Sequence, residues 1–148
     1  MKADSDATSI PHQASLIIKA QADSIVRCTE FVVACATAAR FPLARMRQLE
    51  LVVEEVLVNI CRHAYGDTPG EVEIRCIRVA REHLCVEFID RGKPFNILAS
   101  PPRDLTADVE EREVGGLGIP LIRAMMDEVS YCRAGDRNIL RVTARLPR

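Results

Sequence analysis

Three polar residues recur at four-residue intervals in the stretch EEVLVNICRHAYGD, residues 54–67. They are Glu55, Asn59 and His63, and on a helix this spacing stacks their side chains along one line. The line borders a continuous apolar arc, which is the position that a pocket wall would take. The arc consists of Leu49, Val52, Val53, Val56, Leu57, Ile60 and Ala64. Charged flanks are common on amphipathic helices, so this segment alone favours an ordinary solvated surface.

A carboxylate ends the strand-like segment HLCVEFID, residues 83–90. Strict alternation places Asp90 on the same face as three apolar residues, Leu84, Val86 and Phe88. Because a buried carboxylate needs hydrogen-bond donors, Asp90 is a candidate acceptor for an N–H group of a ligand. Gly92 would let a flat ring approach the backbone there. The alternative interpretation is an aspartate that starts a turn at a strand end.

The sequence GGLG, residues 115–118, precedes the helical run IPLIRAMMDE. Successive backbone N–H groups and the positive end of a helix dipole are the groups that hold phosphate oxygens. The Walker pattern is absent because no Lys-Ser/Thr follows, and the dinucleotide fingerprint lacks its third glycine. A flexible hinge before a helix is the alternative interpretation.

In this order and with these gaps, the three segments resemble the ATP-binding boxes of the superfamily shared by gyrase, histidine kinases and related ATPases. The boxes are Glu55-x-x-x-Asn59-x-x-x-His63-Ala64-Tyr65, Asp90-x-Gly92-x-Pro94-Phe95 and Gly115-Gly116-x-Gly118. Within that superfamily, the short chain and the run MDEV at 126–129 are similar to the anti-sigma factor serine kinases. The resemblance spans about residues 15–146 and implies their Bergerat fold, an α/β two-layer sandwich.

The resemblance implies a role for each box residue. Asn59 would give its amide oxygen to Mg²⁺, Asp90 would accept the adenine amino group, and Glu55 would take the proton of the attacking hydroxyl. Residues 96–114 would form a lid over the nucleotide. The resemblance implies further residues around ATP, which are His63, Gly92, Pro94, Phe95, Gly115, Gly116, Leu117 and Gly118. Of these, His63 would support the pocket rather than take part in catalysis.

The implied function is an ATP-dependent serine/threonine protein kinase that acts as an anti-sigma factor. Its substrate would be an anti-sigma factor antagonist protein, and the unoccupied kinase would sequester a sigma factor. Arg27 lies on the first helix, where this family places an arginine that contacts a partner. One departure is the acidic lid, in which only Arg103 and Arg112 offer positive charge to the γ-phosphate.

Two other functions fit the same boxes. One is a partner switch that binds ATP without kinase activity. The other is a detached ATPase domain of a histidine kinase, which would need an upstream helical pair with a phosphoacceptor histidine. Phosphotransfer to serine or threonine would indicate the protein kinase. ATP binding without a phosphorylated product would indicate the partner switch, and acid-labile phosphohistidine would indicate the histidine kinase domain.

The elements that must position these residues follow from periodicity and from glycine and proline. Helices are expected from Asp23 or Ser24 to about Arg40, across 43–65 and after the GGLG segment. Strands are expected at 15–20, 71–80, 83–90, 128–133 and 138–146, and the last four form two hairpins. The expected sheet is therefore mixed but largely antiparallel, with helices on one face. The broad apolar surface of the first helix allows a homodimer.

Length and composition indicate one domain at 15–148, preceded by a flexible tail at 1–14. The chain has 148 residues, with 48% apolar and 28% charged ones, a globular balance. A net charge of −1 argues against nucleic acid or an anionic membrane as a direct partner. Six scattered cysteines without a C-x-x-C pair indicate free thiols rather than a zinc site, and a reducing, cytoplasmic compartment.

Overall fold

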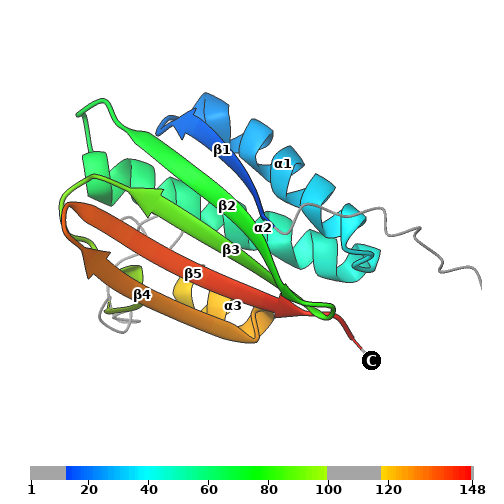
Figure 1. Ribbon diagram of the computed structural model, residues 1–148. Helices are drawn as coiled ribbons and strands as arrows, with labels where there is room; N and C mark the ends of the chain where they lie inside the picture. Colours follow the sequence, from blue (N-terminus) through cyan, green and yellow to red (C-terminus); the bar gives the residue numbers. More distant parts are fainter. Residues whose placement is uncertain (1–12, 100–117, 148) are drawn as a thin grey trace, which may run out of the picture.

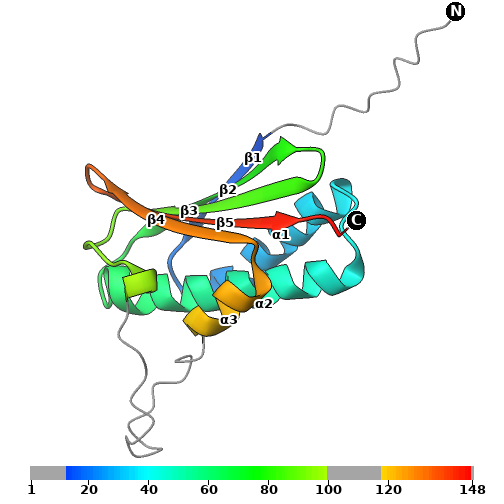
Figure 2. The same ribbon diagram turned by 90° about the horizontal axis from the view of Figure 1, so that it is seen from below.

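Within the described part of the chain, five strands form one sheet, and three helices lie on one of its faces (Figure 1, Figure 2). The computed structural model describes residues 13–99 and 118–147. The strand order is β1-β2-β3-β5-β4, and each of the four pairings in the described residues is antiparallel. The α/β two-layer sandwich with a largely antiparallel sheet is therefore confirmed.

The strands lie close to the expected ranges, because apolar alternation sets their inward face. They are β1 (Gln13–Lys19), β2 (Glu71–Ala80), β3 (His83–Asp90), β4 (Glu128–Ala134) and β5 (Arg137–Arg145). Their buried side chains pack under the helices, and the central ones are Val72, Ile74, Val86, Phe88 and Val142. β1 already includes Gln13 and Ala14, and residues 1–12 lie outside the described part, so the tail stays a prediction.

The first helix, α1 (Ile25–Ala38), follows a short 3-10 turn, η1 (Ala22–Ser24). Its fully buried residues recur at four-residue intervals along one side and are Cys28, Val32 and Ala36. The helix ends before the expected Arg40, which adopts a left-handed φ of 62°. There the N–H of Phe41 donates to the carbonyl of Ala36 across 3.0 Å, which closes the helix end.

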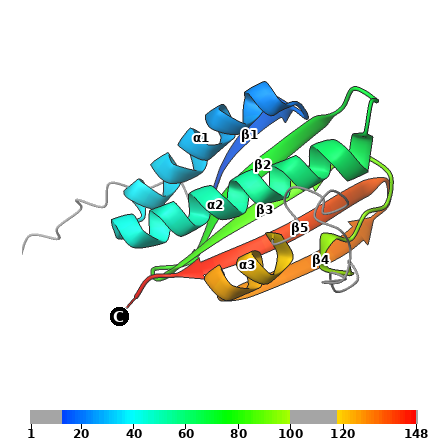
Figure 3. The same cartoon turned by 180° about the vertical axis from the view of Figure 1, so that it is seen from behind.

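The second helix, α2 (Leu43–Asn59), runs across the helix-covered face beside α1 (Figure 3). It does not continue as an α-helix to Tyr65 as expected, because a π-helical turn, η2 (Ile60–Tyr65), follows Asn59. A π-turn has more residues per turn than an α-helix, so side chains after Asn59 leave the line calculated for a straight helix. The position of His63 is therefore set by the π-turn and not by α-helical spacing.

The third helix, α3 (Gly118–Met125), is anchored to the start of α2 by Arg45. The Arg45 guanidinium donates to the carbonyl of Met125 across 2.7 Å and to Asp127 across 2.5 Å. This fixes the C-terminal end of α3, the helix that begins at Gly118. None of the described helices combines the length and the apolar character that a membrane crossing requires.

Candidate functional site

The candidate site lies at the end of the sheet where β3 finishes and β5 begins. Asp90 and Asn138 face each other there as paired residues of these two strands. Asn59, at the end of α2, and Phe95, after β3, line the same cavity as Asp90. Two of the three sequence boxes therefore meet in space.

Asp90 is a buried carboxylate, with 4% of its surface exposed. Its Oδ1 atom accepts hydrogen bonds from the backbone N–H of Gly92 and from Nδ2 of Asn138, both across 2.9 Å. Both bonds end on Oδ1, which leaves Oδ2 as the oxygen for a ligand N–H. Burial raises the pKa of Asp90, against the effect of the two hydrogen bonds.

Asn138 was missed by the sequence reasoning, although it is central to this site. It is 3% exposed, and its Nδ2 atom also donates to the carbonyl of Lys93 across 2.8 Å. Its Oδ1 atom accepts three donors, which are the Tyr131 hydroxyl at 2.5 Å, the Phe95 N–H at 3.2 Å and the Arg133 guanidinium at 3.2 Å. The available signal was alternation in β5, which puts this polar residue on the apolar inward face.

Gly92 brings the end of β3 directly onto η2. A Cβ atom at Gly92 would lie 2.4 Å from the carbonyl oxygen of Ala64, which is far inside contact distance. The next N–H, that of Lys93, donates to the same carbonyl across 3.0 Å. Glycine at this position is therefore required for close packing against Ala64, and the expected approach of a ligand ring to Gly92 stays a prediction.

Tyr65 fastens the other end of η2 to the sheet. Its hydroxyl donates to the carbonyl of Glu71 across 2.6 Å and accepts the N–H of Arg91 across 2.8 Å. Its ring lies so close to Gly70 that a Cβ atom there would be 2.1 Å from the ring. These contacts hold η2 against the ends of β2 and β3, beside Asp90.

Glu55 and Asn59 form the part of the site on α2. Nδ2 of Asn59 donates to the carbonyl of Glu55 across 2.7 Å, which leaves the Asn59 amide oxygen for another partner. Oε2 of Glu55 is buried and has no hydrogen-bond partner among the described residues. Burial, and next Glu54, raise the pKa of Glu55, while Arg62 opposes them. A partly desolvated carboxylate with one oxygen that accepts no hydrogen bond from the described residues is suited to accept a proton.

His63 stacks on Phe95, with ring centroids 4.7 Å apart and an angle of 23° between the rings. His63 thus packs against a residue of the second box. Pro94, which precedes Phe95, is exposed. The cavity between Asn59, Asp90 and Phe95 has a volume of about 20 Å³, room for about one water molecule. A purine base is much larger than this cavity, so lining residues would have to move to admit one.

The third box lies almost wholly outside the described residues. Gly118 is the first residue of α3, whereas the expected phosphate contacts Gly115, Gly116 and Leu117 are not described. The same holds for the lid residues 100–114, including the candidate γ-phosphate ligands Arg103 and Arg112. From the expected lid, Ile97–Ala99 form a short 3-10 turn, η3.

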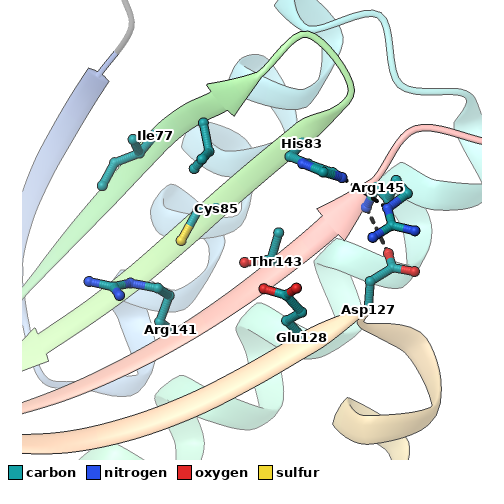
Figure 4. Close-up of a pocket in the computed structure, with 9 residues that line it drawn as sticks. Ile77, His83, Cys85, Asp127, Glu128, Arg141, Thr143 and Arg145 are labelled. Carbon is teal, nitrogen blue, oxygen red and sulfur yellow. Dashed lines mark hydrogen bonds between the residues drawn. The ribbon is translucent and has the colours of Figure 1, made fainter.

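A larger hollow of about 380 Å³ lies on the open face of the sheet, at the opposite end of β3 and β5 (Figure 4). Four of its lining side chains, which are His83, Asp127, Arg141 and Arg145, are engaged in hydrogen bonds or ion pairs. Arg141 pairs with Glu87 across 2.8 Å, and the Arg145 guanidinium donates to His83 across 2.9 Å. Asp127 accepts both the Arg45 guanidinium and the Arg145 N–H. We therefore place the candidate site at Asp90 and Glu55, where carboxylate oxygens remain available.

Comparison with known proteins agrees with this geometry. Residues 18–144 match the family model described as histidine kinase-like ATPase domain. In solved structures, the fold is similar to the Erythrobacter litoralis EL346 blue-light activated histidine kinase. That match has a TM-score of 0.54 and 25% identity, and it covers 72% of this chain and 32% of that one.

Curated relatives have the name serine-protein kinase RsbW. The chain is 30% identical over 126 residues to the protein of Bacillus mycoides (strain KBAB4), covering 82% of this chain and 77% of that protein. It is 30% identical over 99 residues to the protein of Listeria monocytogenes serovar 1/2a, where it covers 64% of this chain and spans 62% of the relative's length. The chain therefore belongs to the histidine kinase-like ATPase domain family and, within it, to the RsbW group of serine-protein kinases.

Proposed function

We propose that this protein is a cytoplasmic, ATP-dependent serine/threonine protein kinase that acts as an anti-sigma factor. It phosphorylates an anti-sigma factor antagonist, and it sequesters a sigma factor when the antagonist does not occupy it. The observation that carries the proposal is the buried Asp90 carboxylate together with the half-buried Glu55, whose Oε2 atom is buried, next to the amide of Asn59. The names of the Bacillus and Listeria relatives support it.

The adenine end of the nucleotide is assigned to Asp90. Its Oδ2 atom accepts the exocyclic amino group of the base, while Asn138 and Gly92 hold Oδ1. The apolar walls of the cavity, Ile60, Ile97 and Leu140, contact the ring faces once lining residues have moved to admit the base. A site built around a hydrogen-bond acceptor rejects bases that lack the matching donor, which favours adenine.

The phosphate end is assigned to Asn59 and the GGLG segment. The Asn59 amide oxygen is an oxygen ligand of the kind that Mg²⁺ prefers, and Mg²⁺ usually takes few ligands from the protein. When bound, this ion would neutralise phosphate charge. Backbone N–H groups of 115–118 hold the phosphate oxygens, in keeping with the start of α3 at Gly118.

Glu55 acts as the general base. Its carboxylate takes the proton of the substrate hydroxyl while that oxygen attacks the γ-phosphorus, and ADP leaves with the pair of electrons of the broken P–O bond. The buried Oε2 atom is available for this proton, since no described residue donates to it. A raised pKa brings Glu55 closer to neutral pH, where a base is most effective.

The partner surface is assigned to α1. Arg27 is exposed there, and the adjacent Val26 is 65% exposed, an unusual position for a large apolar side chain. An arginine beside an exposed apolar residue is a common composition at protein interfaces. The same helix surface would serve a homodimer. The effect of an Arg27 substitution should therefore be measured separately on sigma factor binding and, by sedimentation, on the oligomeric state.

The test is phosphate transfer from labelled Mg²⁺-ATP to the cognate antagonist protein. Glu55→Ala should abolish transfer while calorimetry shows nucleotide binding close to that of the unmodified protein. Glu54→Ala, at the exposed neighbouring position, should retain transfer and is the matched control. ATP binding without a phosphorylated product in the unmodified protein would overturn the kinase assignment in favour of a nucleotide-dependent partner switch.

A further inference from the structure

Two cysteines from different elements meet in a hollow away from the candidate nucleotide site. Cys35 on α1 and Cys76 on β2 both line a cavity of about 210 Å³ on the helix-covered side of the sheet. Cys76 lies four residues along β2 from Val72, the strand partner of Asp90, a separation of about 13 Å. Cys76 is thus remote from Asp90, and neither thiol lines the cavity at Asp90.

The two thiols differ in exposure and in acidity. Cys35 is partly exposed, whereas Cys76 is 3% exposed. The neighbouring Cys76 thiol lowers the pKa of Cys35, against the effect of burial, and Cys35 in turn raises the pKa of Cys76. Cys35 is therefore the thiol assigned to react first, because it is the more exposed of the two. Thiolate character and access are what make a cysteine reactive.

The neighbouring thiols do not share these properties. Cys28 lies two helical turns before Cys35, is fully buried, and has a pKa raised to about 12 by burial. Cys132 is exposed on β4, the edge strand separated from β2 by β3 and β5. Among residues 13–99 and 118–147, no three Cys, His, Asp or Glu side chains are grouped to hold a metal ion. The pair is therefore better explained by thiol chemistry.

We propose that Cys35 and Cys76 are a redox pair that a peroxide converts to a reversible disulfide between α1 and β2. The Cys35 thiolate attacks one peroxide oxygen, the O–O bond breaks, and Cys35 becomes a sulfenic acid as the first water leaves. The Cys76 sulfur then attacks the Cys35 sulfur, and the S–S bond forms as the second water leaves. Two thiols lose two electrons and two protons, and one hydrogen peroxide becomes two waters.

The surroundings permit both steps. Small side chains, Ala34 and Ala38, line the hollow beside Cys35 and leave room for a small oxidant. The same space allows Cys35 to shift toward Cys76, as a bond between the sulfurs requires. Reversible disulfides of this kind in a reducing compartment are typically redox sensors. The pair needs no nucleotide, so it can be tested independently of the kinase assignment.

Peptide mapping of the peroxide-treated full chain tests the pair directly. After the remaining thiols are alkylated, trypsin releases Cys76 within residues 76–78 and Cys35 within residues 28–40. The expected product joins these two peptides, is two hydrogens lighter than their sum, and disappears on treatment with dithiothreitol. Because residues 28–40 also contain Cys28, fragmentation of the joined peptide must locate the bond on Cys35.

Three variants test the assignment of the disulfide to Cys35 and Cys76. Cys35→Ser should lose the joined peptide, whereas Cys28→Ser and Cys132→Ser should retain it. A bond from Cys76 to Cys28, a disulfide involving Cys132, or oxidation of Cys35 to sulfinic acid without any joined peptide would each overturn the proposal. The mapping of the unmodified chain is decisive even if a substitution at the buried Cys76 prevents folding.

Discussion

The Asn138 amide donates a hydrogen bond to Oδ1 of Asp90 across 2.9 Å, from the facing position of the neighbouring strand. The orientation of this amide is fixed, because its own oxygen accepts donors from Tyr131, Phe95 and Arg133. Asn138 therefore holds the carboxylate so that Oδ2 remains for a ligand. It is a positioning residue for the proposed adenine contact.

Substitution of Asn138 tests this relationship. Asn138→Ala removes one hydrogen bond to a charged group, an interaction that contributes about 1.5–3 kcal/mol, so ATP affinity should fall by about 10- to 100-fold. Gln21→Ala is the control, because that exposed polar side chain lies between β1 and η1, outside the candidate site and the expected lid. Calorimetric affinities for ATP that match between the two variants would contradict the role of Asn138.

Asp90→Asn should stabilise the fold and remove ATP binding. Burial raises the pKa of Asp90, so the folded state holds the proton more tightly than the unfolded state. The free energy of unfolding therefore falls as pH rises from the unfolded pKa through the folded pKa, and the cost is fully present above it. A neutral amide avoids this cost and still accepts the Gly92 N–H. Its Nδ2 atom cannot accept from adenine.

Urea unfolding at two pH values measures the effect of Asp90→Asn. The variant should exceed the unmodified protein in free energy of unfolding at pH 7, and the difference should shrink below the unfolded pKa of aspartate. Asp67→Asn, at an exposed turn, should change neither stability nor affinity. Retention of ATP affinity by Asp90→Asn would show that the adenine contact lies elsewhere.

The sequence predicted the parts of this fold that depend on local pattern. Alternation in β3 put Asp90 on the inward face, where it is buried, and the apolar arc of α2 is buried as expected. The hairpin joining β2 and β3 at Arg81 and Glu82 follows from two apolar runs separated by two polar residues. These features need only periodicity and turn residues.

The missed parts depend on contacts between distant segments. The π-turn of η2 is held by Tyr65, which bonds Glu71 and Arg91 beyond the helix, so helical periodicity could not reveal it. Asn138 acquires its role only when β5 pairs with β3 in one particular register. The packing role of Gly92 was missed as well, because its neighbour is the backbone of Ala64, 28 residues earlier in the chain (92 − 64).

Gly92→Ala tests the packing of β3 against η2. The added Cβ atom would lie 2.4 Å from a backbone oxygen, which cannot rotate away, so η2 must shift from the sheet. We expect a loss of about 1–3 kcal/mol in stability, as for overpacked cores, together with weaker ATP binding. Thermal unfolding and calorimetry measure the two effects.

Gly135→Ala is the glycine control for that variant. Gly135 has a φ of 60° and no neighbouring atom within 4 Å of an added Cβ, so the substitution strains only the hairpin. It should cost about 1–2 kcal/mol through its left-handed backbone and leave ATP affinity unchanged. If Gly92→Ala also left affinity unchanged, η2 would not position the site.

The pH dependence of phosphotransfer tests Glu55 as the base. Its pKa is raised by burial and by Glu54 and lowered by Arg62, so kcat/KM should rise with pH through a midpoint above that of an exposed glutamate. Glu54→Gln removes a negative neighbour and should move this midpoint to lower pH. Arg62→Gln removes a positive neighbour and should move the midpoint to higher pH.

Glu55→Gln should lower the rate of phosphotransfer by about 10²- to 10⁴-fold and abolish the rise of kcat/KM with pH. Shifts of the midpoint in the same direction for the Glu54 and Arg62 variants would mean that another group titrates.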